Sequence, residues 1–423
     1  MTSAHSHEGE TGSALIAKTL ATELSKKHQV LYMHLSDRFK VKKVSKNLTF
    51  LGIPKSDIHG VQIPYVTIGI KNKAALVFEK FNPDVVHAQN IIFDGVLAAL
   101  WAKEHNVPYL LTLHHIPHEG VSYIFPKLKE KKFLHFLDRI YSTIYINTFI
   151  KLSSLVIALN KTIISSLNII NPNSKYVEIN NGIELKKFQA LKINKPQKTI
   201  NFIYPGSYID RKNQIFLVKA FRYLPKNYIL NLYGHRELGF SYTVWLEEIS
   251  KKYHLNNVHV NDYAIDKDLL NAYEKSNYLI SASIKEVQSL VIIEAMASGK
   301  PIIGLKNETI NELVNNTNGL SLPQGTSPKV FADKVKQYVQ KTNKNYLNVA
   351  KATRLSSSRF DVVKVAPRVA AAYGQAIKNH EQNDDKNEGR QIVLQLFLVI
   401  SIILSVLARS FSIISSLFSR QLD

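Results

Sequence analysis

Residues 286–303 read EVQSLVIIEAMASGKPII, and this stretch decides the fold of the second half of the chain. Ser289 fits the N-cap of a helix that carries Glu294 and ends at Gly299, and the proline that follows opens a new strand. The pattern therefore predicts a loop at Glu286, a helix and a return to a sheet. An ordinary turn between a strand and a helix is the alternative interpretation.

Two carboxylates flank the predicted start of this helix. The backbone N–H groups of Ser289, Leu290 and Val291 lie between Glu286 and Glu294, at the helix end with positive dipole character. Amides in this position hold a phosphate, and carboxylates accept hydrogen bonds from hydroxyls. A nucleotide sugar presents both groups, so the stretch indicates a site for such a ligand.

A cationic cluster follows an earlier predicted strand, in residues 206–212, which read GSYIDRK. Gly206 lets the backbone approach a ligand, and the adjacent Arg211 and Lys212 neutralise a diphosphate. Cations there stabilise the charge that develops as a glycosidic bond breaks. A solvated Arg-Lys pair in a surface loop is the alternative, but the position after a strand and upstream of the glutamates favours function.

Histidines crowd the end of a predicted strand in the first half, in residues 112–118, which read TLHHIPH. A single histidine at a strand end, such as His114, is usually structural. Metal binding by His114, His115 and His118 is an alternative, but their spacing on a loop is unspecific. We expect no metal and no other cofactor.

Strand and helix patterns alternate along the chain, which predicts an α/β fold with parallel sheets. The expected helices include 12–26, 95–105, 215–224 and 266–274, and the expected strands include 30–34, 109–114, 155–159, 176–179, 199–204, 228–233, 258–260, 278–281 and 301–304.

These motifs resemble those of the retaining glycosyltransferases of family 4. The glutamates and the A-M-A-x-G-x-P run match the family's E-x7-E region, although Gln288-Ser289 stand where the family usually has Phe-Gly. Lys212 matches the family lysine, whereas Ser207 occupies the position of the family arginine, for which Arg211 is the expected substitute. The resemblance implies the GT-B fold, in which two doubly wound Rossmann-like domains face a cleft.

The resemblance also implies roles for individual residues. Glu286 would bond the donor sugar and Glu294 the ribose, while His114 fits a T-x-H histidine near the reacting sugar. Gly12 matches a glycine loop that packs near the donor phosphates. Gly182 lies in an N-G-I segment similar to one near the family's domain junction, and a turn that requires positive φ explains this glycine equally well.

The expected organisation follows from the same comparison. It comprises an N-terminal acceptor-side domain (1–188), a polar linker (189–198), a C-terminal nucleotide-sugar domain (199–359), a crossover helix (360–377), a polar tether (378–391) and a hydrophobic segment (392–418). We expect Pro367 to kink or delay the crossover helix, because proline lacks the N–H that an inner turn uses.

The amino-acid composition limits the classes of partner that the chain can have. The 423 residues carry a formal charge of +21 and no cysteine, which excludes disulfides, thiol nucleophiles and cysteine-ligated zinc and fits a reducing cytoplasm. The basic residues are spread along the chain without a nucleic-acid-binding signature, so an anionic lipid or substrate is the preferred partner. Residues 125–136 interleave lysines with aromatics, which suits either an anionic membrane surface or a solvated helix face.

The hydrophobic segment, with apolar runs at 392–408 and 411–418, is long enough for an in-plane anchor or for a short spanning helix. The segment therefore predicts a protein attached to a membrane, and the positive-inside rule places its basic body on the cytoplasmic face.

We conclude from the sequence that the chain is a retaining glycosyltransferase, which transfers a sugar from a nucleotide-sugar donor to a membrane-associated lipid or glycan. The expected catalytic residues are Glu286, His114 and Lys212. Two alternatives stay open: a sugar-nucleotide epimerase of the same fold, and a catalytically silent, membrane-tethered binding partner of another transferase, which the serine at position 207 leaves open.

Overall fold

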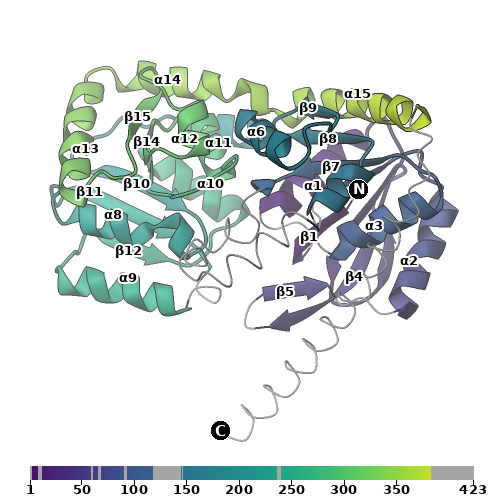
Figure 1. Ribbon diagram of the computed structural model, residues 1–423. Helices are drawn as coiled ribbons and strands as arrows, with labels where there is room; N and C mark the ends of the chain where they lie inside the picture. The colour runs from purple at the N-terminus through teal and green to yellow at the C-terminus, as the bar shows by residue number, and fades with distance from the viewer. Residues whose placement is uncertain are drawn as a thin grey trace, which may run out of the picture. The chain divides into compact units, whose positions relative to one another are not determined.

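The computed structural model describes residues 2–7, 12–58, 61–64, 68–89, 93–117, 144, 146–235 and 240–382 of the chain. The chain divides into two compact units, shown in Figure 1. Among the described residues, the first unit holds those up to Gly182 and those from Val362 onward, and the second unit holds Ile183–Asp361.

The first unit is built from strands and helices in alternation. Its elements are β1 (Thr2–His7), α1 (Gly12–Leu24), β2 (Val30–Ser36), β3 (Lys40–Lys43), β4 (Leu48–Ile58), β5 (Val61–Pro64), α2 (Ile68–Phe81), β6 (Val86–Ala88), α3 (Phe93–Glu104), β7 (Tyr109–Leu113), α5 (Asn147–Leu152), β8 (Leu155–Ala158), α6 (Lys161–Ile170), β9 (Tyr176–Glu178) and α15 (Val362–Glu381).

The strands of this unit form one sheet in the order β3-β4-β2-β1-β6-β7-β8-β9, and β5 pairs with β4. The pairings from β4 through β9 are parallel, whereas β3 and β5 run antiparallel to β4. The strand order reverses between β1 and β6. Ligands of open α/β sheets bind beyond the carboxyl ends of the strands at such a reversal, so the segments after β6 and β7 are well placed for function.

The second unit is a smaller α/β body. Its elements are α7 (Leu185–Gln189), β10 (Ile200–Pro205), the 3₁₀ turn η4 (Asp210–Lys212), α8 (Gln214–Phe221), β11 (Tyr228–Tyr233), α9 (Phe240–Lys252), β12 (Val258–Asn261), α10 (Asp266–Lys275), β13 (Tyr278–Ser281), α11 (Leu290–Ala297), β14 (Ile302–Leu305), α12 (Glu308–Leu313), β15 (Gly319–Leu322), α13 (Pro328–Asn343), α14 (Tyr346–Ser356) and η6 (Ser358–Phe360).

The sheet of the second unit is parallel throughout, in the order β12-β11-β10-β13-β14-β15. Helices α8, α9 and α13 pack together, and α7, α11 and α14 form another group, so the sheet is wound on both faces (Figure 1). The order reverses between β10 and β13. The loops after these two strands carry the predicted cations and the predicted glutamate, respectively, which is the placement expected for a ligand site.

Helix α15 packs on the first unit. Val365, Val369 and Ala372 lie along one of its faces and are buried against Leu110 of β7 and Leu155 of β8. Pro367 lies inside this helix and does not delay it, because the helix begins upstream at Val362. The helix also continues to Glu381, so the first residues of the predicted tether are helical.

Gly182 lies where α15 begins. The predicted turn with positive φ at this glycine is wrong, because positive φ among the described glycines is confined to Gly12, Gly206 and Gly299. A Cβ atom added to Gly182 would lie 2.9 Å from the Cα atom of Val362. The glycine is therefore required by the close approach of the helix.

The expected fold class of Rossmann-like parallel sheets is confirmed for both units. Across the ranges that the structure describes, no helix is both long and apolar enough to cross a membrane. The hydrophobic segment 392–418, most of the tether and the basic segment 125–136 lie outside those ranges.

Candidate active site

Glu286 lies in the loop between β13 and α11, and the first turn of α12 holds its backbone. Its N–H donates to Oε2 of Glu308 at 2.9 Å, and its carbonyl oxygen accepts from the N–H and from Oγ1 of Thr309, each at 3.1 Å. Asn307 begins this turn as an N-cap, since its side chain accepts from the N–H of Ile310. A third segment of the sheet edge therefore fixes the loop that carries the glutamate.

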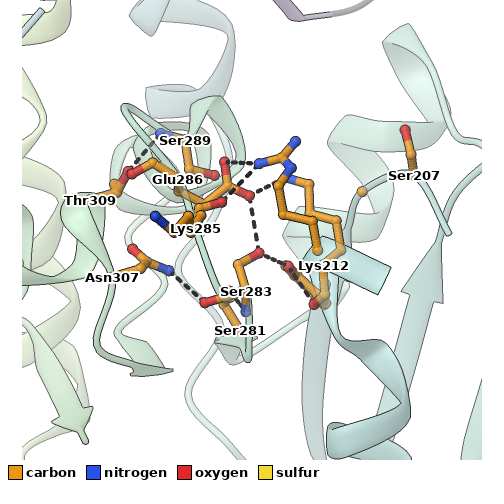
Figure 2. Close-up of polar contacts among 12 residues, drawn as sticks. Ser207, Lys212, Ser281, Ser283, Lys285, Glu286, Ser289, Asn307 and Thr309 are labelled. Carbon is orange, nitrogen blue, oxygen red and sulfur yellow. Dashed lines mark hydrogen bonds and ion pairs between the residues drawn. The ribbon is translucent and has the colours of Figure 1, made fainter. Parts of the chain in front are cut away.

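The two predicted cations converge on the Glu286 carboxylate, as Figure 2 shows for Lys212. Lys212 Nζ donates to Oε1, and Arg211 Nη1 lies 3.4 Å from Oε2 while also donating to the carbonyl oxygen of Lys285 at 2.8 Å. Ser283 Oγ donates to Oε1 at 3.0 Å. The side chains of Glu286, Lys212 and Arg211 are only 8%, 12% and 15% exposed, so these are buried charges.

The electrostatics of the cluster favour an ionised Glu286 beside its two cations. Burial alone would raise the pKa of Glu286, but the positive charges of Lys212 and Arg211 outweigh burial and hold this pKa below the usual 4.5. Burial lowers the pKa of Lys212, and the Glu286 charge opposes that shift. The cluster thus combines two cationic groups with one anionic group in a site that excludes most water.

Tyr204 of β10 contacts residues on both sides of the cluster. Its hydroxyl contacts Ser283 Oγ, and it donates to the carbonyl oxygen of Lys212 at 3.2 Å. Because this tyrosine touches both the glutamate's serine partner and the lysine's backbone, it ties the segments after β10 and β13 together.

Glu294, the second predicted glutamate, lies inside α11 and is buried. Its Oε2 accepts a hydrogen bond from the Tyr273 hydroxyl of α10 at 3.0 Å. Burial raises the pKa of Glu294 to about 7, although the Tyr273 hydrogen bond and the nearby charge of Lys187 oppose the rise. This carboxyl therefore titrates near neutral pH, in contrast to Glu286.

The start of α11 is partly occupied by the protein itself. Ser289 is the N-cap residue, but its side chain makes no capping hydrogen bond. Its N–H donates to Thr309 Oγ1 at 3.0 Å, so this amide already has an acceptor. Leu290 and Val291 supply the N–H groups of the first turn, which helix geometry leaves without intrahelical partners. The helix ends with Gly299 at a φ of +70°, as the sequence predicts.

Gly206 follows β10 with a φ of +157°, and its carbonyl oxygen accepts from Gln214 Nε2 at 3.2 Å. A Cβ added to Gly234, at the end of β11, would lie 2.5 Å from that same carbonyl oxygen. Figure 2 shows Ser207 beyond Lys212, on the side away from Glu286. Arg211, and not the residue after the glycine, is the one that reaches the carboxylate.

The remaining predicted residues belong to the first unit. His114 follows β7, and its Nε2 lies 2.8 Å from Oε1 of Gln89, which follows β6. Gly12 opens α1 with a φ of +54°. Among the described residues, no group of three or more His, Cys, Asp or Glu side chains is arranged to hold a metal, and His118 lies outside them.

Sequence reasoning missed the partners that hold these residues in place: Tyr204, Tyr273, Ser283, Glu308, Thr309 and Gln89. One signal was available, because Asn307-Glu308-Thr309 follows a strand and has the composition of a helix start. The others are single polar residues at strand ends or in helices, with nothing in the sequence to connect them to the glutamates.

The sequence matches two family descriptions. "Glycosyltransferase Family 4" matches residues 11–187, and "Glycosyl transferases group 1" matches residues 186–355. No curated protein matches the chain.

Solved structures with the same fold include the following three. The sucrose-phosphate synthase tll1590 from Thermosynechococcus elongatus is 18% identical, with a TM-score of 0.70 over 89% of this chain and 99% of its own. A glycosyltransferase from Rickettsia africae ESF-5 is 18% identical, with a TM-score of 0.66 over 89% and 98%. Anabaena Alr3699/HepE in complex with UDP-glucose is 17% identical, with a TM-score of 0.67 over 88% and 98%.

At these identities the structural matches establish the fold, and the two family matches, which together run from residue 11 to residue 355, establish the family. The chain belongs to the family 4 glycosyltransferases with the GT-B fold, and it is a transferase.

Proposed function

We propose that the chain is a retaining glycosyltransferase that takes its sugar from a nucleotide-sugar donor, whose diphosphate binds to Lys212 and Arg211. The single observation that supports this is the buried contact of both cations with Glu286, at the point where the strand order of the second unit's sheet reverses. Both buried cations face the same carboxylate, so a diphosphate can share them with Glu286. It can also take hydrogen bonds from both side chains.

The carboxylates then have separate tasks. Glu286 accepts hydrogen bonds from hydroxyls of the donor sugar once the diphosphate shares its cations. Glu294 accepts from the ribose, and the first-turn amides of Leu290 and Val291 support a phosphate. The amide of Ser289 contributes less, because Thr309 Oγ1 already accepts its hydrogen.

The proposed mechanism needs no dedicated protein base. The leaving phosphate takes the proton of the acceptor hydroxyl on the same face of the sugar, while Lys212 and Arg211 stabilise its growing charge. Retention of the anomeric configuration follows from attack on that face. His114, a residue of the first unit, is proposed to contact a hydroxyl of the sugar.

The donor is proposed to be a uridine diphosphate sugar first of all, because the similar Anabaena protein is described in complex with UDP-glucose. The proposed acceptor is a lipid or a glycan at the cytoplasmic face of a membrane. Its support is the sequence alone: the apolar segment 392–418 and the formal charge of +21.

A donor screen tests the first part of this proposal. Thermal shift with a panel of sugar nucleotides should raise the melting temperature of the wild type, because a ligand that binds only the folded state stabilises it. Lys212→Met should abolish the shift. Lys219→Met, a change of an exposed lysine in α8, should leave it intact. Donors that stabilise all three proteins equally would show that Lys212 does not bind them.

Turnover separates the competing functions. Release of free nucleotide in the presence of an acceptor, abolished by Glu286→Ala, supports transfer, and nuclear magnetic resonance of the product's anomeric proton tests retention. Epimerised donor without transfer supports an epimerase. Tight donor binding without any turnover supports a silent partner.

Membrane attachment is tested with a shortened chain. The cut belongs after Gln382, because α15 runs to Glu381 and Asn379 donates to the carbonyl oxygen of Ser154 at 3.0 Å. We expect the full chain in the membrane pellet and the shortened chain mostly in the supernatant. Complete retention of the shortened chain in the pellet would contradict attachment through the tail.

A further inference from the structure

A buried polar network lies behind His114 in the first unit. It runs from His114 to Gln89, from Gln89 to His87, and from His87 to Tyr373 on α15. Gln89 and His87 are each 2% exposed, and Thr112 joins the network at His87. A chain of neutral groups of this kind has a direction, because each donor must meet an acceptor.

The amide of Gln89 sets that direction. Its Nε2, which can only donate, lies 3.1 Å from Nε2 and 3.5 Å from Nδ1 of His87, so it meets the electron-rich face of this ring, where a carbonyl oxygen would be unfavourable. Thr112 Oγ1 lies 2.7 Å from Nε2 of His87. The Tyr373 hydroxyl lies 3.0 Å from Nδ1, so one of these two hydroxyl groups donates to the ring and the other accepts from it.

The same amide presents its oxygen to the other histidine. Oε1 of Gln89 can only accept, and it lies 2.8 Å from Nε2 of His114, so the hydrogen of His114 is on Nε2. The lone pair of this neutral ring is consequently on Nδ1. A nitrogen lone pair accepts a hydrogen bond from a hydroxyl and cannot donate one.

We propose that Gln89 is a positioning residue that holds His114 in the Nε2–H tautomer, so that Nδ1 accepts a hydrogen bond from a hydroxyl of the sugar substrate. This inference rests on the proposed function for the identity of the ligand, but the tautomer itself is a property of the chain alone. Its consequence is chemical selectivity: the ring recognises a group that donates, such as a hydroxyl, and rejects an ether or a carbonyl oxygen at the same place.

Burial keeps both rings neutral, which the network requires. It lowers the pKa of His114 to about 3, with the charge of His115 as a smaller cause, and it lowers the pKa of His87 to about 3 as well. A second consequence concerns α15. Because Tyr373 contacts Nδ1 of His87, a hydroxyl on the last described helix takes part in placing the hydrogen on a histidine far away in the sequence.

Nuclear magnetic resonance of the full chain labelled with ¹⁵N-histidine reads the tautomers directly. Each of the 15 histidines gives cross-peaks between its ring nitrogens and carbon-bound protons, and the His114→Gln variant identifies those of His114. We expect a protonated Nε2 and an unprotonated Nδ1 for His114. A protonated Nδ1 in the wild type would overturn the proposal, because the network would then have the opposite direction.

Two variants test the cause. Gln89→Leu removes the acceptor of the His114 hydrogen, and Tyr373→Phe removes the hydroxyl that contacts Nδ1 of His87 while leaving the site untouched. Both should shift the ¹⁵N resonances of His114 towards a mixture of tautomers. Tyr338→Phe in α13 is the matched control, because its buried hydroxyl has no hydrogen-bond partner among the described residues, and it should change nothing. Unchanged His114 resonances in both test variants would overturn the role of Gln89.

Activity supplies the second arm. Once a donor is known, Gln89→Leu and Tyr373→Phe should lower kcat/KM about tenfold, the equivalent of one hydrogen bond. A donor whose hydroxyl is replaced by a methoxy group should lose the same factor with the wild type and almost nothing with Gln89→Leu. Tautomers as expected without any turnover would contradict the proposed function and leave the positioning role intact. Turnover with the hydrogen of His114 on Nδ1 would contradict the positioning role of Gln89 and leave the proposed function intact.

Discussion

The cluster around Glu286 is held together by buried charges, whereas the network behind His114 is held together by hydrogen bonds between neutral groups. The first gathers three buried charges from segments 74 positions apart, and every charge has an opposite partner. The second gathers neutral groups and spans 286 positions, and it needs only a consistent direction of its hydrogen bonds. A buried charge must be compensated by an opposite charge, and charged residues are easy to recognise in a sequence. The direction of a hydrogen-bond network is set by common neutral polar residues, which a sequence does not single out.

This difference predicts unequal tolerance to substitution. Loss of a partner leaves an uncompensated charge in the first region, which is a large penalty. In the second region the same loss leaves a neutral group that can reorient. The experiments below are ordered from the largest expected effect to the smallest.

Glu286→Gln should destabilise the second unit most. The change keeps the shape of the side chain but removes the negative charge that Lys212 and Arg211 share in a buried site, which we expect to reduce the free energy of unfolding by about 3–5 kcal/mol. Denaturation in urea measures this. Added pyrophosphate should recover part of the loss, because it supplies the missing negative charge.

Glu312→Gln is the matched control for that change. Glu312 pairs with Arg359 at 2.7 Å on the surface, where side chains remain 25% and 49% exposed, so its loss should change the free energy of unfolding by about 1 kcal/mol or less. Equal effects of both changes would contradict the importance of burial in the Glu286 cluster.

Thr309→Val should have the next largest effect. Thr309 is completely buried, and the change removes the oxygen that accepts from the Ser289 N–H and donates to the Glu286 carbonyl. A buried N–H without a partner reduces stability by about 1–3 kcal/mol. Thr309→Ser keeps the oxygen and should retain most of the stability and donor binding. A valine variant as stable as the serine variant would show that this oxygen does not hold the loop.

The sequence was informative where chemistry and chain order coincide. Strands β10, β11 and β13 lie within a residue of their predicted bounds, because each is an apolar run that ends at turn residues. The sequence likewise placed Arg211 and Lys212 after one predicted strand and Glu286 after another. It did not predict that these strands are neighbours, which is what brings the cations into contact with the glutamate.

Elements outside such patterns were not predictable. Strand β4 contains Gly52 and Pro54, which normally interrupt strands, and β3 is a fully exposed lysine-rich edge. Gly52 has a tertiary cause, since an added Cβ would lie 2.6 Å from the Cβ of Ser36 in β2. Thr309 and Gln89 were missed likewise, because only the packed sheet brings them to the glutamate and the histidine.

Donor binding should depend on pH through Glu294. The pKa of this carboxyl is about 7, against an ordinary 4.5, so it is a carboxylate only above neutral pH. Ribose hydroxyls donate, and they therefore bind the ionised form. We expect affinity to fall roughly tenfold from pH 8 to pH 6, the ratio of ionised fractions across such a pKa. Titration calorimetry measures the affinity and the accompanying release of protons.

The groups facing Glu294 are Tyr273 and Lys187, and burial raises the pKa of Tyr273 well above its usual 10, so this hydroxyl keeps its proton in this range. By linkage, the raised pKa contributes stability below about pH 4.5 that is lost as the pH rises through about 7. Glu294→Gln should remove both pH dependences. Persistence of the binding profile in this variant would assign the titration to another group.

The smallest effect concerns the helix that carries Tyr373. Gly374 lies inside α15, and an added Cβ would meet no atom within 4 Å, so Gly374→Ala should raise the free energy of unfolding by about 0.5–1 kcal/mol. Gly182→Ala, where the Cβ would lie 2.9 Å from Val362, should lower it instead. Melting curves of both variants give the sign. Gly374→Ala should also leave the His114 tautomer unchanged, because the network depends on the direction of its hydrogen bonds and not on the strength of the helix. A changed tautomer in this variant would mean that the two histidines respond to the packing of α15 as well as to its hydroxyl.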